Sequence, residues 1–345
     1  MRWWHDMGFW RGAATMPTSR KKDKKAHKRD LHFLVTLCPS MPHFARFATD
    51  YRLSGIRINS AQMYTYELDS EIEAISKVKN PVPLFYDIKG MQLRVEEVVD
   101  NPDCLEMRSN HPIKVNLPTE VLFKAEQDSA TLVEIKDGNL LIFEGGPKWM
   151  VRKGESFHIR HPSLEVGGDT FTPGEKEKIA KVRAAGFTRY CLSYVQKQRH
   201  VDEFAELVGK DSDIVLKIED PKGLRYVAEE YKWKKNRHLM AARGDLFVEV
   251  NKPHDIIAAM KTIIGADPGA WVGSRLLLSV IPQRGPDGKY LADTGPSCAD
   301  FSDIAWLYEI GYRKMLLCDE LCMKQEWLGT CVNVLEAFRS SYAKR

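Results

Sequence analysis

The stretch "DIVLKIEDPKGLRYVAEEYKWKKNRHLMAARGD", residues 213 to 245, holds a strand, a helix and a second strand in that order. Its first run, residues 213–219, is mostly apolar and carries Lys217 and Glu219 near its end; residues 236–243 form a similar run. Near-continuous apolar runs are typical of parallel strands that are covered on both faces. The polar segment between the runs has the length of one helix, so the stretch predicts a β-α-β unit.

The same alternation extends in both directions along the chain. Strand-like runs occur at residues 32–38, 55–59, 82–88, 188–194, 213–219, 236–243, 274–281 and 313–317. Helix-like segments follow them near residues 41–52, 63–77, 174–185, 198–209, 220–232, 254–266, 299–310 and 324–343. Eight repeats of strand and helix predict an α/β fold of the (β/α)₈ barrel type, built from residues 31–94 and 174–345.

One segment, residues 95–173 after the third strand, interrupts the alternation. It contains "TLVEIKDGNLLIFEGGPKWMVRKGESFHI" (131–159), in which short β-rich runs alternate with Asp-Gly and Gly-Gly turn signals. We therefore expect a small β-rich insert over the mouth of the barrel. His158 and His161 stand three residues apart near its end, and we interpret them as a surface pair rather than a metal site.

Charge is unevenly distributed along the chain. Residues 1–30 hold nine Lys or Arg and three Asp, so the net charge of +4 leaves about −2 for all later residues. The first 30 residues are interpreted as a disordered basic leader, with organelle import or nucleic-acid contact as the alternatives. The near-neutral remainder does not predict a nucleic-acid partner. The basic stretch 228–238 is interpreted as a solvated helix end rather than a base-stacking surface.

Composition indicates a soluble protein of a reducing compartment. No apolar run approaches the roughly 18 residues that would suggest a membrane span. The seven cysteines have no framework spacing, which favours the cytoplasm over a secreted, disulfide-bonded class.

Polar side chains gather at the carboxyl ends of four predicted strands, where barrel enzymes assemble their active sites. They are Arg57 and Asn59, Asp87 and Lys89 with Arg94 shortly after, Lys217 and Glu219, and Arg243 with Asp245.

Glu219 and Asp245 end neighbouring strands, which lie about 4.8 Å apart, so their carboxylates are expected to converge. Two such charges about 4 Å apart cost on the order of 4 kcal/mol at an effective dielectric of 20, so they require a proton or a cation. Magnesium, or manganese, fits this oxygen-rich pair, and Gly244 lets the backbone approach a ligand. The hypothesis requires an ion, not a lysine amine, between the two carboxylates. The alternative is that Arg243 and Asp245 only pair with loop neighbours.

Three cations, Arg57, Lys89 and Lys217, are expected to face this carboxylate pair. Such an arrangement suits an anionic substrate that is bridged by a metal ion.

Five segments together resemble pyruvate kinase, in the same order and on the corresponding strands, from about residue 32 to the end. They are "GIRIN" (55–59), "YDIKGMQLRV" (86–95), "KIED" (217–220), "MAARGDLFVEV" (240–250) and "PSCADFSDIAWLYEIGYRKMLLCDE" (296–320). In addition, "TFTPGEKEKI" (170–179) is similar to the segment by which that family's chain returns from its lid domain.

The resemblance implies phosphoryl transfer from phosphoenolpyruvate to a nucleoside diphosphate such as ADP. It assigns Glu219 and Asp245 to magnesium, and Lys217 to the transferring phosphoryl group and the enolate. It places Arg57 at phosphate, Asn59 and Asp87 at a monovalent cation, and Arg94 near the nucleotide phosphates. Arg243 is expected to take part in catalysis, and Lys89 and Gly244 to contact substrate. Barrel-to-barrel pairing into a homo-oligomer is also implied.

Several positions depart from the family pattern. Ala61 and Ile88 stand where the family has hydroxyl groups of its potassium site, so a complete potassium site is not predicted. We align Val280 with a threonine linked to proton transfer, and Cys298 with an arginine; only Glu320 remains of the eighth-strand motif. The insert is shorter than the family's lid, and the family's regulatory domain is not expected.

Three functions remain open from the sequence. The first is a minimal phosphotransferase that uses phosphoenolpyruvate, magnesium and a nucleotide. The second is other chemistry of a metal-bound pyruvate enolate, such as aldol cleavage or decarboxylation. The third is a catalytically degenerate barrel that acts as a binding or assembly module.

Overall fold

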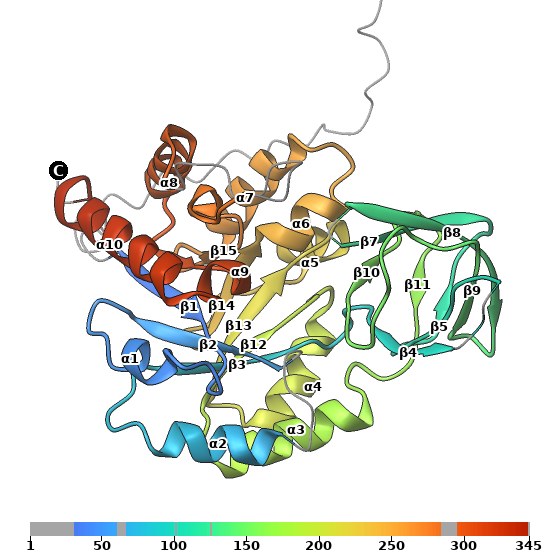
Figure 1. Cartoon of the computed structure of the whole chain (residues 1–345), viewed down its shortest axis with the longest axis horizontal. Helices are drawn as coiled ribbons and strands as arrows, with labels where there is room; N and C mark the ends of the chain where they lie inside the picture. Colours follow the sequence, from blue (N-terminus) through green and yellow to red (C-terminus); the bar gives the residue numbers. More distant parts are fainter. Residues whose placement is uncertain are drawn as a thin grey trace, which may run out of the picture.

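The computed structural model describes residues 31–60, 67–99, 101, 103–124, 126–283 and 295–343. Eight parallel strands close into a barrel, in the order β1, β2, β3, β12, β13, β14, β15, β16 (Figure 1). They are β1 (His32–Thr36), β2 (Gly55–Asn59), β3 (Leu84–Ile88), β12 (Arg189–Leu192), β13 (Asp213–Ile218), β14 (Arg237–Ala242), β15 (Trp271–Gly273) and β16 (Lys314–Leu316). The predicted (β/α)₈ barrel is confirmed.

Helices follow the strands and cover the outside of the barrel (Figure 1). They are α1 (Phe44–Ala48), α2 (Leu68–Ser76), α3 (Pro173–Ala184), α4 (Gln198–Val208), α5 (Pro221–Glu229), α7 (Asp255–Ala266), α8 (Cys298–Ile310) and α10 (Gln325–Ser341). Two of them begin with a capping box, in which a hydroxyl and an acidic side chain satisfy the first free N–H groups. Thr172 and Glu175 start α3, and Ser297 and Asp300 start α8.

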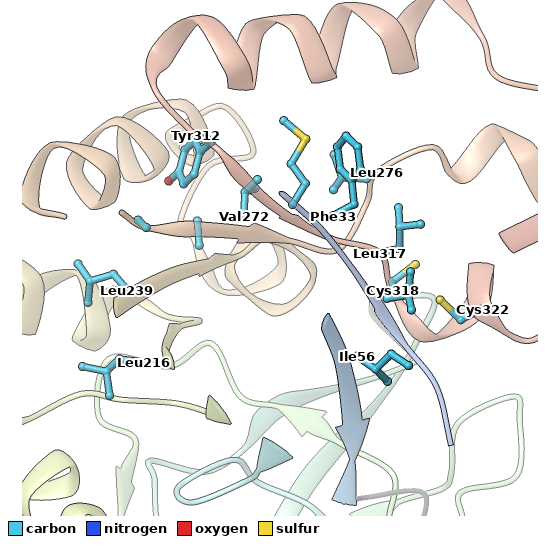
Figure 2. Close-up of a cluster of buried hydrophobic side chains, with 14 of the residues drawn as sticks. Phe33, Ile56, Leu216, Leu239, Val272, Leu276, Tyr312, Leu317, Cys318 and Cys322 are labelled. Atoms are coloured by element: carbon cyan, nitrogen blue, oxygen red, sulfur yellow. The ribbon is translucent and has the colours of Figure 1, made fainter. Parts of the chain in front are cut away.

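The barrel strands alternate strictly between an outer and an inner face. Outward side chains form the large core under the helices, and Figure 2 shows part of it, including Phe33 on β1, Leu216 on β13 and Val272 on β15. Inward side chains form a separate cluster inside the barrel, which includes Val215 on β13 and Trp271 on β15. Because the side-chain period of a strand is two, Lys217 shares the inner face with Val215.

The insert after β3 is a small β-domain with its own core (Figure 1). A six-stranded antiparallel sheet has the order β10, β7, β8, β9, β5, β4, and β6 pairs with β11. The strands are β4 (Val95–Val99), β5 (Glu106–Ser109), β6 (Ile113–Lys114), β7 (Thr119–Phe123), β8 (Asp128–Lys136), β9 (Leu140–Glu144), β10 (Phe157–His158) and β11 (Glu165–Val166). This confirms a β-rich insertion after the third barrel strand.

The seventh strand was predicted in the wrong place. The structure puts β15 at Trp271–Gly273, whereas the predicted run 274–281 bends away from the barrel and ends in a 3₁₀ turn, η2 (Leu278–Val280). Leu276, Leu277 and Val280 are nevertheless buried, so the run is apolar because it enters the core beneath the helices. Burial, not strand pairing, explains its composition.

Two short helices were not predicted. The first, α6 (Arg243–Glu249), follows β14 directly, and the second, α9 (Asp319–Cys322), begins three residues beyond the last residue of β16. The basic leader, residues 1–30, lies outside the described residues. Among the described residues, no helix combines the length and apolar composition that a membrane crossing requires.

Candidate active site

Asp87 lies at the centre of the polar cluster on the carboxyl side of the barrel. Its Oδ2 accepts hydrogen bonds from Arg57 Nη2 at 2.6 Å and from Lys89 Nζ at 2.7 Å, and Lys217 Nζ lies 3.7 Å away. The Asp87 side chain is fully buried. Burial alone would raise the pKa of its carboxyl, but the charges of Lys217, Lys89 and Arg57 outweigh burial, and the pKa is lowered. The three predicted cations are thus brought together, but around Asp87.

Lys217 connects Asp87 to Glu219. Its Nζ lies 2.9 Å from Glu219 Oε1 and donates a hydrogen bond to Ser193 Oγ at 2.7 Å. Glu219 Oε2 accepts a bond from the backbone N–H of Tyr194 at 2.7 Å. Burial, together with the charge of Asp245, raises the pKa of Glu219 to about 7, although Lys217 opposes this change. Burial and the neighbouring Asp245 thus work against the charged form of Glu219 despite its contact with Lys217.

Asp245 lies in the first turn of α6, three residues beyond the last residue of β14, rather than at a strand end. Its Oδ2 accepts a bond from Gln92 Nε2 at 2.9 Å, and its Oδ1 lies 3.9 Å from His158 Nε2. The sequence predicted two strand-end carboxylates with an ion, not a lysine amine, between them. The structure differs in two respects: Asp245 lies on a helix, and the Lys217 amine contacts Glu219.

The two carboxylates fit a magnesium ion in charge and chemistry. Asp245 is close enough to disfavour the charged form of Glu219, and its side chain remains 26% exposed. Within the described part of the chain, no group of three or more His, Cys, Asp or Glu could hold a metal. Magnesium often takes only one or two protein carboxylates and completes its octahedron with water and substrate oxygens. Glu219 and Asp245 would supply that share.

Asp319 was missed by sequence reasoning, which singled out Glu320 next to it. Its Oδ2 accepts a bond from Arg57 Nη1 at 3.2 Å, and its Oδ1 accepts one from Asn59 Nδ2 at 3.0 Å. Arg57 therefore binds two carboxylates, those of Asp87 and Asp319. An acidic residue three positions beyond the eighth strand was the available signal, since that end of the barrel faces the site.

Arg243 is engaged away from the Asp87 cluster. Its guanidinium binds both oxygens of Asp303 on α8, at 2.7 and 2.9 Å, and the Ser274 carbonyl oxygen at 3.0 Å. Gly244 lies in α6, and a Cβ there would stand 3.4 Å from Ser274. These contacts fix α6 to the loop after β15, so they position Asp245.

Arg94 links the barrel to the insert. Its Nε and Nη2 donate to Gln92 Oε1 at 3.1 and 2.8 Å, and its Nη1 donates to the Gly154 carbonyl oxygen. Through Gln92 it supports Asp245. Burial lowers the pKa of Arg94, against the charges of Asp245 and Asp87.

The loop after β15 places a hydroxyl residue, Ser274, directly at the end of the strand. Ser274, Arg275 and Leu277 have φ values of 66°, 56° and 54°. Left-handed conformations in residues other than glycine cost energy and gather at functional sites. Val280, which was aligned with a proton-transfer threonine, lies in η2 within the hydrophobic core. It is therefore not at the strand end.

His158 of β10 was predicted to lie on the surface, and this was wrong. It is 3% exposed, and its Nδ1 lies 2.6 Å from Glu249 Oε1 on α6 and 3.2 Å from the Tyr194 hydroxyl. Burial lowers the pKa of His158, but the hydrogen bond to Glu249 and the charge of Asp245 outweigh burial and raise it. Phe157 and Ile159 belong to the core of the insert, so His158 between them points the other way, and the sequence alone did not show that this face is covered by α6.

Replacement of Glu249 by Gln is expected to loosen the insert from the barrel. Buried hydrogen bonds to charged groups contribute about 1.5–3 kcal/mol, so amide hydrogen exchange near His158 should become about 10- to 100-fold faster. Exchange in β13 should not change. Glu229→Gln, on α5, is the control. Equal exchange in the Glu249 variant and the wild type would show that the contact does not hold the insert.

No protein-family model matches the chain. Curated proteins do match it. The chain is 26% identical to the pyruvate kinase of Thermoplasma acidophilum over 298 residues, and the matched region covers 78% of this chain and 52% of that protein. The chain is similar to pyruvate kinases. That of Agrobacterium vitis is 28% identical over 182 residues, 51% of this chain and 36% of that protein. That of Borreliella burgdorferi is 24% identical over 243 residues, 64% of this chain and 50% of that protein.

The chain spans about half the length, or less, of the curated pyruvate kinases it matches. The similarity over the aligned regions agrees with the family resemblance of the five sequence segments and with the (β/α)₈ barrel.

Proposed function

We propose that this protein transfers a phosphoryl group between phosphoenolpyruvate and a nucleoside diphosphate, with magnesium or manganese as the cofactor. The observation that carries the proposal is the buried cluster at the carboxyl end of the barrel. There Lys217 contacts Glu219 and lies 3.7 Å from Asp87, which also binds Arg57 and Lys89. Similarity to pyruvate kinases supports the same reaction.

Glu219 and Asp245 would hold the metal ion, since Asp245 is close enough to disfavour the charged form of Glu219 and a cation would relieve this repulsion. When bound, magnesium supplies positive charge for the oxygens of the substrate and of the transferring phosphoryl group. Gln92 and His158 flank Asp245 and orient it from the insert side.

Lys217 is the proposed hydrogen-bond donor to the substrate oxygens on which charge develops. Burial would lower the pKa of its ammonium group, but Asp87 and Glu219 outweigh burial and raise it. A lysine that stays charged in a buried site can stabilise developing negative charge without reorganisation of solvent. Ser193 fixes the direction of its amine.

Arg57 and Lys89 are proposed to contact phosphate, with Arg94 nearer the nucleotide. Phosphoryl transfer needs mainly positioning and positive charge around the moving group, and these side chains supply both. Asn59 and Asp87 do not form a potassium site in this proposal, because Asn59 binds Asp319 and Asp87 is saturated by cations. A reducing compartment such as the cytoplasm, and pairing of barrels, remain part of the proposal.

A second candidate is metal-dependent chemistry of the pyruvate enolate without phosphoryl transfer. It is favoured by one observation: Arg57 is bound by two carboxylates, those of Asp87 and Asp319, and is therefore less available to a phosphate dianion. Lys217, Glu219 and Asp245 would serve the enolate in the same way.

A coupled assay tests the proposal. With phosphoenolpyruvate, a panel of nucleoside diphosphates and Mg²⁺, the protein is expected to form pyruvate, with turnover abolished by a chelator. Turnover should not require potassium. No pyruvate from any diphosphate, with Mg²⁺ and K⁺ both present, would eliminate phosphoryl transfer.

The second candidate has a separate readout. In D₂O, with protein and Mg²⁺ present, pyruvate would exchange its C3 protons for deuterium. NMR measures this exchange. Exchange without phosphoryl transfer would favour enolate chemistry, and absence of both activities would favour the binding-module hypothesis.

A further inference from the structure

A cavity lies at the opposite end of the barrel from the candidate active site. It has a volume of about 210 Å³ and is lined by residues at the amino ends of the strands. Trp271 is the first residue of β15 and Lys314 the first of β16, and the two are paired in register. Such a volume is smaller than a site for a drug-sized ligand, so it suits a small molecule.

The cavity is separated from the active site by side chains inside the barrel. Val215 lines the cavity, and Lys217, two residues further along β13, faces the site at the other end. Cys191 and Met240 belong to the same interior cluster as Val215 and are buried. A ligand in the cavity would therefore not contact the proposed metal or phosphate groups.

Two hydrogen-bond donors at this cavity have no acceptor within the described part of the chain. Trp271 Nε1 is buried without a hydrogen-bond partner. Lys314 Nζ makes no hydrogen bond or ion pair there and lies over the Trp271 ring, 5.6 Å from its centroid. Burial lowers the pKa of Lys314, and Asp267 and Asp213 only partly oppose this. The Trp271 N–H is therefore a buried donor without a partner, which is costly, and Lys314 is a partly exposed cation beside it. An acceptor with negative charge would satisfy the first and pair with the second.

The other charged groups of the cavity are already paired. Arg189 Nε lies 3.7 Å from Asp213 Oδ2, and His238 Nδ1 lies 3.3 Å from Asp267 Oδ2. This leaves Lys314 as the cation that lacks a carboxylate among the described lining residues. Of the lining side chains, Arg189 and Lys314 are cationic and Asp213 is anionic, so the lining carries one excess positive charge, which matches a monovalent anion.

The remaining wall is apolar and partly aromatic. Phe85 and Trp271 pack edge to face, with ring centroids 4.9 Å apart and planes at 72°. Leu34 and Val215 complete this surface. A ligand with a flat apolar body would bury its surface here while its charged end meets Lys314.

We propose that this cavity binds a small monocarboxylate with an aromatic or compact apolar body. Its carboxylate accepts from Lys314 Nζ and Trp271 Nε1, and its body packs against Phe85, Leu34 and Val215. The site is independent of the proposed phosphoryl transfer.

Benzoate, with neutral benzamide as its matched control, is a suitable probe. Binding to the full chain would be measured by titration with ligand-observed NMR. We expect saturable benzoate binding, with benzamide at least tenfold weaker. Oxalate with Mg²⁺, which would fill the candidate active site, should not displace benzoate. No saturable binding, equal binding of benzamide, or displacement by oxalate would overturn the proposal.

Lys314→Met retains most of the side-chain volume and removes the charge, so it should weaken benzoate binding at least tenfold. Lys261→Met, at an exposed position of α7, should leave binding unchanged. If the Lys314 variant does not fold, Trp271→Phe provides the test, because it keeps a ring and removes the N–H donor. A severalfold loss is expected there. Wild-type affinity in a folded Lys314 or Trp271 variant would contradict the assigned contacts.

Discussion

Replacement of Lys217 by Met is expected to lower kcat for phosphoryl transfer by about 10²- to 10³-fold, as for the loss of one donor to a developing oxyanion. The Lys217 ammonium is buried, held charged by Asp87 and Glu219, and aimed by Ser193. No other cation contacts Glu219 within the described residues. Arg57 and Lys89 are bound to Asp87 and cannot replace it.

Steady-state kinetics of the variant, with phosphoenolpyruvate and a nucleoside diphosphate, check this expectation. KM should change much less than kcat, because an interaction made mainly in the transition state affects kcat. Manganese binding, followed by electron paramagnetic resonance, should persist, since Glu219 and Asp245 remain. Lys77→Met, at an exposed position that pairs with Glu73, is the control. A kcat within threefold of the wild type would show that Lys217 does not act on the substrate.

The order of strands and helices could be predicted because covered parallel strands leave continuous apolar runs. The seventh strand shows the limit of this signal. Trp271–Gly273 is short, whereas the neighbouring run 274–281 is longer and contains more apolar residues. Strand position is decided by backbone pairing with β14 and β16, which hydrophobicity does not report.

The site residues on strands could be predicted from the same alternation. Arg57, Asp87 and Lys217 face inward because the residues on either side of each face outward into the core. Asp245 could be placed near the site but not oriented, since it lies on α6 and its direction depends on Arg243, Ser274 and Asp303. Contacts of this kind come from segments far apart in the sequence.

The sequence did not predict which side chains the predicted site residues bind. The pattern of charges indicated cations facing Glu219 and Asp245, yet most of those cations bind Asp87. Asp319 and His158 join the site from the last strand end and from the insert. Their roles depend on pairings between segments that only the fold brings together.

Replacement of Asp87 by Asn is expected to destabilise the fold by about 3–5 kcal/mol, the usual cost of removing one partner from a buried ion pair. The Asp87 side chain is fully buried and lies within 4 Å of Arg57, Lys89 and Lys217. An amide cannot compensate these charges, and it leaves an N–H₂ group facing cations. Chemical denaturation of the variant and the wild type, read by circular dichroism, measures the change in the free energy of unfolding.

Asp319→Asn is the matched control, because Asp319 also binds Arg57 but its side chain is 25% exposed and its ion pair is longer, at 3.2 Å. Water can reach that carboxylate, and Arg57 keeps Asp87 as a partner, so the loss of Asp319 should cost clearly less than the loss of Asp87. The difference between the two variants therefore separates burial from the mere presence of an ion pair. Equally small losses of stability in both variants would contradict the central role of Asp87. The three cations would then have to relax toward solvent or toward Glu219 in the Asp87 variant. If Asp87→Asn alone is strongly destabilised, added oxalate with Mg²⁺ should recover part of the loss, since ligand that binds only the folded state stabilises it.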